Sequence, residues 1–266
     1  MTYSRDFAQQ PGAPSLHITE AADQLRALGV RPGDVLMIHA SMRKVGRIEG
    51  GVDGLIDALA MAVGPAGTLM AYADFEPTEA VPYFDLERSP CAADHGVFAE
   101  ALRQREGTLR STNPGASVVA NGAAAMGLVA PHPLRYGYGR GTPFERFVAA
   151  GGKVLLLGSD FDHVTILHHA EALADLPDKR IVRNEVRVRT GDEITSVQIE
   201  EFNTSIAVVA AMPDSIFDDI VSAYVATREV GSGMVGGAQT FLLEAADLVA
   251  YAIAWMEREY GRGAGE

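Results

Sequence analysis

Short apolar runs alternate with amphipathic segments through the first half of the chain. Residues 35–39 and 68–72 are continuous apolar runs with the length of a buried strand. Between them, residues 52–63 carry apolar side chains at helical spacing, and this segment stops at Gly64-Pro65, a pair that terminates helices. Alternation of this kind predicts an α/β fold with helices packed on a sheet.

The same patterns predict the remaining elements. Residues 182–202 alternate around Gly191-Asp192, which is typical of an antiparallel hairpin. Residues 76–95 are rich in proline and acids and predict a long surface loop, a feature that is usually functional in a compact domain. We expect one α/β domain over residues 1–266, with a central mixed sheet flanked by helices and an antiparallel hairpin in the C-terminal half. Further helices are expected at 18–28, 97–105, 164–176, 216–227 and 245–259, and strands at 117–120 and 153–157, so that the last third is mainly two helices.

Composition narrows the class of protein. No run of 18 apolar residues is present, residues 1–10 lack the apolar stretch of a secretory signal, and a single cysteine fits a reducing cytosol. The formal net charge is −13, from 22 Lys and Arg against 35 Asp and Glu. An acidic surface repels nucleic-acid phosphates and anionic lipid and attracts cations. We therefore expect a cytoplasmic protein with neither a nucleic-acid nor a membrane partner.

Several common catalytic motifs are excluded. The pattern G-x-G-x-x-G at 231–236 follows a helical segment instead of a strand, so it predicts tight turning or close packing and not a dinucleotide site. Neither Ser159 nor Ser232 lies in G-x-S-x-G. The histidines at 163, 168 and 169 do not match a zinc spacing, so no metal is expected. Cys91 has no basic motif nearby and is interpreted as a bystander.

Five segments, in this order, resemble the aminoglycoside 3-N-acetyltransferases, a family distinct from the GNAT acetyltransferases. They are HASMRKVG at 39–46, RSTNPGAS at 110–117, YGYGRGTPF at 136–144, TILHHAE at 165–171 and MVGGA at 234–238. They are spread over residues 39–238, and the resemblance covers the chain from about residue 20 to 260. The resemblance implies acetyl-coenzyme A as cosubstrate and a polycationic aminoglycoside as acceptor.

Coenzyme A carries phosphates, so an acidic protein must supply local donors. Thr142-Pro143 is typical of a helix N-cap followed by proline in the first turn, and a helix N-terminus suits a phosphate or an oxyanion. Taken singly, Arg43 and Arg110 would be interpreted as surface charges and the glycines as turns. The resemblance instead favours their binding the cosubstrate. The expected cosubstrate residues are Ser41, Arg43, Lys44, Val45, Gly46, Arg110, Ser111, Ser117, Thr142 and Phe144.

Acetyl transfer to an amine needs a base, because the acceptor arrives largely as ammonium. Histidine suits this role near neutral pH. The resemblance implies His168 as the base, with Glu171 on the same helical face to orient it, or alternatively to pair elsewhere. Asp218 completes the expected catalytic set. His39 is either a supporting or a core residue, whereas His17, His95 and His132 are assigned to ordinary packing, and His169 is expected to point elsewhere.

The acceptor needs carboxylates for its ammonium groups and aromatic edges for its sugar faces. The expected residues are Tyr72, Asp74, Glu76, Tyr138, Glu200, Glu201, Asn203 and Asp214. Two positions depart from the family as the resemblance presents it. Relatives often carry glutamate at the position of Asp218 and aspartate at that of Asn203, and the loop 76–94 is shorter than in several relatives.

The expected activity is therefore transfer of the acetyl group of acetyl-coenzyme A to the 3-amino group of the 2-deoxystreptamine ring, which confers antibiotic resistance. We expect direct attack in a ternary complex. The alternatives are acetylation of a different amine, sequestration without turnover, and thioester hydrolysis. The chain is expected to be a monomer or a homodimer.

Overall fold

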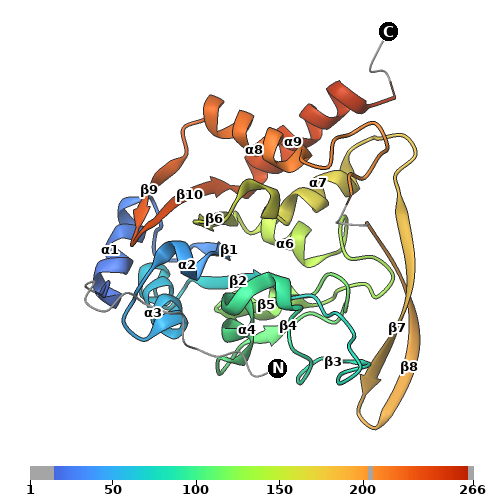
Figure 1. The fold of residues 1–266 in the computed structure, drawn as a ribbon, viewed down its shortest axis with the longest axis horizontal. Helices are drawn as coiled ribbons and strands as arrows, with labels where there is room; N and C mark the ends of the chain where they lie inside the picture. The colour runs from blue at the N-terminus through green and yellow to red at the C-terminus, as the bar shows by residue number, and fades with distance from the viewer. Residues whose placement is uncertain (1–14, 203–205, 263–266) are drawn as a thin grey trace.

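Seven strands of the computed structural model form one mixed sheet, in the order β4-β5-β2-β1-β6-β10-β9 (Figure 1). The structure describes residues 15–202 and 206–262, so Asn203 lies outside the described residues. β2, β1 and β6 are parallel to one another, and antiparallel strands extend the sheet on both sides. The strands are β1 Val35–Ala40, β2 Thr68–Tyr72, β4 Leu109–Arg110, β5 Val118–Gly122, β6 Lys153–Leu157, β9 Gly231–Val235 and β10 Ala238–Glu244.

Helices cover both faces of the sheet. Along β1 the side chains alternate between two hydrophobic cores, because successive residues of a strand point to opposite faces. Val35 and Met37 belong to the core that includes α6 to α9, and Leu36 and Ile38 belong to the core that includes α1, α3 and α4. The helices are α1 Ile18–Ala27, α2 Met42–Val45, α3 Gly51–Val63, α4 Gly96–Gln104, α5 Ala125–Val129, α6 Pro143–Ala149, α7 Ile166–Leu173, α8 Ile216–Thr227 and α9 Ala245–Tyr260.

A second sheet stands beside the main body. β7 (Ile181–Thr190) and β8 (Glu193–Phe202) form a hairpin of ten residue pairs, and the short strand β3 (Phe84–Asp85) pairs with β7. Figure 1 shows the hairpin running along one side of the molecule, at the right of the view. β3 lies in the loop that follows β2, so this loop connects the main sheet to the hairpin.

The fold class predicted from the sequence is confirmed. β2, β6 and α8 have the predicted bounds, and β1, α3, α9 and the hairpin differ by one residue at an end. The prediction that the last third is mainly two helices was wrong, because β9 and β10 precede α9 and extend the sheet beyond β6. α7 is also shorter than predicted.

The glycines at 236 and 237 make the turn between β9 and β10, as tight turning predicts. Gly236 has φ +58°, and a Cβ at Gly237 would lie 2.8 Å from the carbonyl oxygen of Lys44. The turn therefore packs against the backbone of α2, which follows β1. This contact places β10 next to the carboxyl end of the parallel strands. Within the described ranges, none of the helices combines the length and the apolar character that a membrane span requires.

Candidate active site

His168 lies in the first turn of α7, beyond the carboxyl end of β6. Its Nδ1 is 2.7 Å from Oε2 of Glu171, which follows one helical turn later. Because a carboxylate only accepts hydrogen bonds, Nδ1 carries the proton, and the neutral ring keeps its lone pair on Nε2. The Glu171 side chain is 3% exposed and that of His168 is 14% exposed. The pair is therefore shielded from water and fixed in one tautomer.

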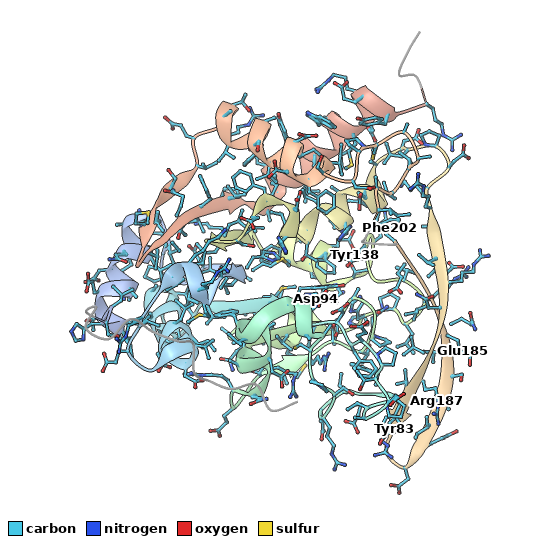
Figure 2. All side chains as sticks on the ribbon, in the orientation of Figure 1. Tyr83, Asp94, Tyr138, Glu185, Arg187 and Phe202 are labelled. Carbon is cyan, nitrogen blue, oxygen red and sulfur yellow. The ribbon has the colours of Figure 1, made fainter. Side chains whose placement is uncertain are left out.

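Three aromatic rings surround His168. The ring centroids of Phe217 and Tyr138 lie 4.8 Å and 5.1 Å from that of His168. Phe202 lies 6.5 Å away and stacks on Tyr138 at an interplanar angle of 6°. Figure 2 shows Tyr138 and Phe202 together, near α7 and the end of the hairpin. These rings come from α8, from the loop before α6 and from β8, so the fold brings three distant segments to the imidazole.

The Tyr138 side chain is held by a hydrogen bond between its hydroxyl group and that of Tyr72. Tyr72, at the end of β2, donates to the carbonyl oxygen of Gly115 at 3.0 Å, and its hydroxyl lies 2.9 Å from that of Tyr138. Since the Tyr72 proton is used on the carbonyl, Tyr138 donates to Tyr72 and presents lone pairs to other donors. Burial raises the pKa of both tyrosines above 10, so both remain neutral.

Asp74 and Glu201 supply carboxylates next to the tyrosines. Asp74 follows β2 and its carboxylate contacts Nε2 of His95. The His95 ring lies edge-on to Tyr72, with centroids 4.8 Å apart. Glu201, on β8, accepts a hydrogen bond from Asn184 at 2.5 Å, and burial together with the charge of Asp74 raises the pKa of Glu201. His95, which the sequence analysis assigned to packing, therefore belongs to the acidic part of the site.

The other acids expected to bind the acceptor are placed differently. Glu200 is ion-paired with both Arg135 and Arg183, at 3.0 Å and 2.9 Å. Asp214 is exposed and accepts from the backbone N–H of Ala207 at 3.0 Å, so it organises its own loop. Glu76 is exposed beyond the end of β2. Of the expected carboxylates, Asp74, Glu200 and Glu201 lie in the region of Tyr72 and Tyr138, and Glu200 is already paired with two arginines.

Two cavities flank the His168 region. The smaller, of about 220 Å³, is lined by Tyr138, Phe202, Glu200, Glu201 and Lys179 among others. The larger, of about 450 Å³, lies at the carboxyl edge of the sheet. Its lining consists of Lys44, Gly158, Ser159, Asp160, Phe161, Asp218, Gly237, Gln239 and Phe241. The His168 ring contacts Tyr138 and Phe202 of the smaller cavity and Phe217, the chain neighbour of Asp218 in the larger one.

The segment after β1 supplies the positive charge of the larger cavity. Ser41 is the N-cap residue of α2, and Arg43 and Lys44 are exposed on that helix. The Lys44 ammonium lies 2.6 Å from Asp160. Val45 is buried and its carbonyl oxygen accepts from the N–H of Gly237 at 2.9 Å, and Gly46 ends the helix at φ +86°.

Arg110 lies in the core and not on a cavity wall. Its guanidinium donates to the carbonyl oxygens of Ser89 and Ala73 and to the Ser117 hydroxyl, and it stacks over Phe84. Burial lowers the pKa of Arg110 to about 10, so it remains charged at neutral pH. Because all of these donors are used internally, the geometry gives no support to the expected coenzyme A contact from this side chain.

Four further residues expected at the cosubstrate are also buried. Ser111 bonds His132, and Ser117 donates to the carbonyl oxygen of Ala73. Thr142 stands at the N-cap position of α6, as predicted, but its hydroxyl donates to Gly139 and does not cap the helix. Phe144 packs under Tyr138, with ring centroids 5.0 Å apart. The side chains of these four residues are therefore part of the core next to the site.

The remaining histidines are mostly packing residues. His132 bonds Ser111 and Gly137. His169 accepts from the N–H of Gly139 at 3.2 Å and points away from His168, as predicted. Burial lowers the pKa of His39 to about 3, and its Nε2 is covered without a hydrogen-bond partner among the described residues. No group of three or more His, Cys, Asp or Glu in residues 15–202 and 206–262 is arranged to hold a metal ion.

The chain is similar in sequence and in fold to known proteins of one enzyme family. A family model described as aminoglycoside 3-N-acetyltransferase matches residues 37–257. Aminoglycoside N(3)-acetyltransferase III of Serratia marcescens is 39% identical over 258 residues, which cover 89% of this chain and 96% of the relative. The solved structure of AAC-IIIb in a binary complex with CoASH superposes with a TM-score of 0.91 at 43% identity, covering 94% of this chain and 99% of that one. AAC-VIa bound to sisomicin gives a TM-score of 0.87 at 34% identity, covering 93% and 99%.

The relatives that match this fold and sequence over most of the chain are acetyltransferases, so the chain is an enzyme of the acyltransferase class. The family match over most of the chain makes the assignment specific. This chain belongs to the aminoglycoside 3-N-acetyltransferase family.

Proposed function

We propose that this protein transfers the acetyl group of acetyl-coenzyme A to the 3-amino group of the 2-deoxystreptamine ring of aminoglycoside antibiotics. The observation that carries the proposal is the position of His168. Its ring packs against Tyr138 and Phe202, which line the smaller cavity, and against Phe217, the chain neighbour of Asp218 in the wall of the larger cavity. A base at this junction can reach a cationic acceptor on one side and an anionic cosubstrate on the other.

His168 is the general base of this proposal. Its Nε2 takes the proton of the attacking amine as the nitrogen bonds to the thioester carbonyl carbon. The carbon–sulfur bond then breaks, and the proton passes to the leaving thiolate. Glu171 holds the ring by Nδ1 and stabilises the imidazolium that forms in between. No acyl-enzyme is needed, because both substrates are bound at once.

Glu171, and not Asp218, is the carboxylate in contact with the imidazole. Asp218 is exposed and lines the larger cavity, where its backbone N–H donates to Asp162 at 3.2 Å. We therefore assign Asp218 to the neighbourhood of the cosubstrate. Backbone N–H groups at this edge of the sheet are suited to polarise the thioester carbonyl.

The larger cavity suits coenzyme A, and a relative of this fold is known in a complex with CoASH. Arg43 and Lys44 are the cations of the segment that ends β1. A phosphate would replace Asp160 as the partner of Lys44, since both are anions that a lysine ammonium binds. The glycines at 158 and 237 line this cavity and let the chain pack closely against Lys44, since a Cβ at either position would lie 2.8 Å from an atom of Lys44.

The smaller cavity and the acids beside it suit the acceptor. Asp74 and Glu201 provide negative charge, and Tyr138 presents a hydroxyl oxygen that accepts from an ammonium group. Relatives carry the name aminoglycoside N(3)-acetyltransferase, and one of the superposed structures holds sisomicin. These observations support an aminoglycoside over a smaller amine.

The test is the release of coenzyme A thiol from acetyl-coenzyme A, with and without a panel of aminoglycosides. Loss of a general base costs about 10²–10⁴-fold in kcat, so we expect that loss in His168→Ala. His169→Asn is the matched control, because it lies on the same helix and its side chain keeps an acceptor for the Gly139 N–H. The site of acetylation is read by mass spectrometry and NMR of the product.

Other outcomes contradict the proposal in distinct ways. Thiol release without any acceptor would mean thioester hydrolysis. Thiol release only with amines other than aminoglycosides would mean that the acceptor is a different amine. Equal losses in His168→Ala and His169→Asn would remove His168 from its role as the base.

A further inference from the structure

The loop after β2 returns to the end of β2 and holds Asp74 by its backbone. The N–H of Ala92 donates to the Asp74 carbonyl oxygen at 3.0 Å, and Arg110 donates to the same oxygen at 3.3 Å. The N–H of Phe75 donates to Pro114 at 2.8 Å. The position of Asp74 at the acidic side of the site is therefore fixed from three segments of the chain.

The same loop delivers His95 to the Asp74 side chain. His95 is the last residue of a short 3₁₀ turn, Ala93–His95, directly before α4, and its Nε2 contacts the Asp74 carboxylate. The two side chains are 21% and 24% exposed, so both border the site without being solvated on all sides. Asp94, the residue before His95, is labelled in Figure 2 and shows where this turn lies.

We propose that His95 is a positioning residue for acceptor binding, which orients Asp74 through its Nε2–H and weakens the attraction of Asp74 for the acceptor when the imidazole is protonated. The inference rests on the proposed function, in which Asp74 binds an ammonium group of the acceptor.

The hydrogen bond has the same geometry in both charge states. A carboxylate only accepts, so Nε2 donates whether the ring is neutral or protonated. Protonation at Nδ1 adds one positive charge beside Asp74 without moving either side chain. The acceptor ammonium then competes with His95 for the same negative charge, and by linkage each weakens the binding of the other.

The groups that face His95 set the pH range of this competition. They are Asp74 and Tyr72 of the β2 segment, Asp94 at 3.8 Å, Arg110 of β4, and His39 of β1, which is neutral. Burial lowers the pKa of His95, but the hydrogen bond and charge of Asp74, together with Asp94, outweigh burial and raise the pKa above 6.5. The competition therefore sets in at a higher pH than it would for a free imidazole.

The test compares wild type with His95→Gln across pH 5.5–8.5. Glutamine keeps an N–H donor for Asp74 but does not titrate. As the pH falls, the KM for the aminoglycoside in wild type should rise relative to that in His95→Gln, by about fivefold or more, a typical coupling between two ligands. Protonation of the acceptor amines affects both proteins equally, so the ratio isolates His95. The KM for acetyl-coenzyme A should show the same pH profile in both.

Two further variants keep the inference falsifiable. His95→Leu removes the donor and should raise the acceptor KM above that of His95→Gln at every pH. In an Asp74→Asn background, His95→Gln should no longer change the pH dependence of the acceptor KM, because no charge remains for which the imidazole and the acceptor compete. Parallel acceptor-KM profiles in wild type and His95→Gln would overturn the inference while acceptor-dependent turnover persists. Absence of acceptor-dependent thiol release in wild type would instead overturn the proposed function.

Discussion

In the proposed mechanism, a single carboxylate decides how well His168 works as a base. Glu171 is nearly fully buried, and its carboxylate accepts a hydrogen bond from the imidazole. Its negative charge therefore acts on the ring with little screening by water. The same side chain fixes the tautomer, so orientation and charge come from one residue.

Glu171→Gln separates these two contributions. The amide can still accept from Nδ1–H, but it no longer stabilises the imidazolium. A charge-assisted hydrogen bond contributes about 1.5–3 kcal/mol, and about 1.4 kcal/mol corresponds to tenfold in rate, so kcat should fall about 10- to 100-fold. Both KM values should change little. Steady-state kinetics at saturating concentrations measure this, and an unchanged kcat would show that the charge of Glu171 is not used.

Some site residues could be predicted from the sequence and others could not. His168 and Glu171 stand in one short motif on one helical face, so local spacing was sufficient. His95 was missed because it lies 21 positions after Asp74 in the chain, and no local sequence pattern indicates a contact over that separation. The sequence did contain one indication of its role, because His95 ends the loop at residues 76–95, which was predicted to be functional.

At the scale of elements, the buried runs were recognised and the glycine-rich strand was not. β1, β2 and β6 each contain a run of four buried residues, because both faces of the parallel strands are covered. β9 reads Gly-Ser-Gly-Met-Val and has no apolar alternation, so its strand conformation depends on pairing with β10 and on close packing against α1. Gly231, for example, has no room for a Cβ, which would lie 2.1 Å from the Leu28 carbonyl oxygen.

Arg110 shows how an element can hold a loop in place. Its side chain joins β4 to the end of β2 and to the returning loop at Ser89, and these contacts support the Asp74–His95 pair. The sequence motif identified an important arginine, but burial gives it a structural role. A flat guanidinium can reach several carbonyl oxygens in different directions, whereas a lysine ammonium cannot.

Arg110→Lys should therefore destabilise the protein. The buried carbonyl oxygens of Ser89 and Ala73 would lose donors, and breaking a buried ionic hydrogen-bond network costs about 3 kcal/mol or more. Urea unfolding followed by circular dichroism measures the loss. Arg135→Lys is the control, since that side chain is exposed beside Glu200 and its replacement should leave the unfolding midpoint almost unchanged. Equal midpoints for the two variants would contradict the structural role of Arg110.

At the scale of the whole molecule, charge is distributed unevenly. The net charge of −13 favours a cationic acceptor, while Arg43 and Lys44 give the cosubstrate side local positive charge. Several arginines of the hairpin neutralise neighbouring acids, as Arg183 does for Glu200, so the hairpin is less acidic than the composition suggests. Overall charge predicted the sign of the acceptor, but only the fold shows which acids remain available to it.

Buried neutral histidines make stability dependent on pH. Burial lowers the pKa of His39 to about 3 and those of His132 and His169 to about 4. In the unfolded chain these rings titrate near 6.5, so below that pH the unfolded state binds protons that the folded state does not. Each group then lowers the free energy of unfolding by about 1.4 kcal/mol per pH unit between pH 6.5 and its folded pKa. His95 has a raised pKa and acts in the opposite direction only above pH 6.5, so its stabilising contribution is already complete in the acidic range where the other three rings act.

We therefore expect the free energy of unfolding to fall as the pH is lowered from 7 to 5, a range above the pKa of most carboxylates. Between pH 6 and pH 5 the slope should approach three protons, because three buried rings stay neutral in the folded state, whereas His95 is protonated in both states well below pH 6.5 and adds no slope there. Urea unfolding at half-unit pH steps measures this slope, and His169→Asn should reduce it by about one proton, since asparagine does not titrate. A free energy of unfolding that stays constant from pH 7 to pH 5 in wild type would mean that these rings accept protons in the folded state. Acid would then leave the fold intact, and any loss of activity in this range would have to come from the active-site groups alone.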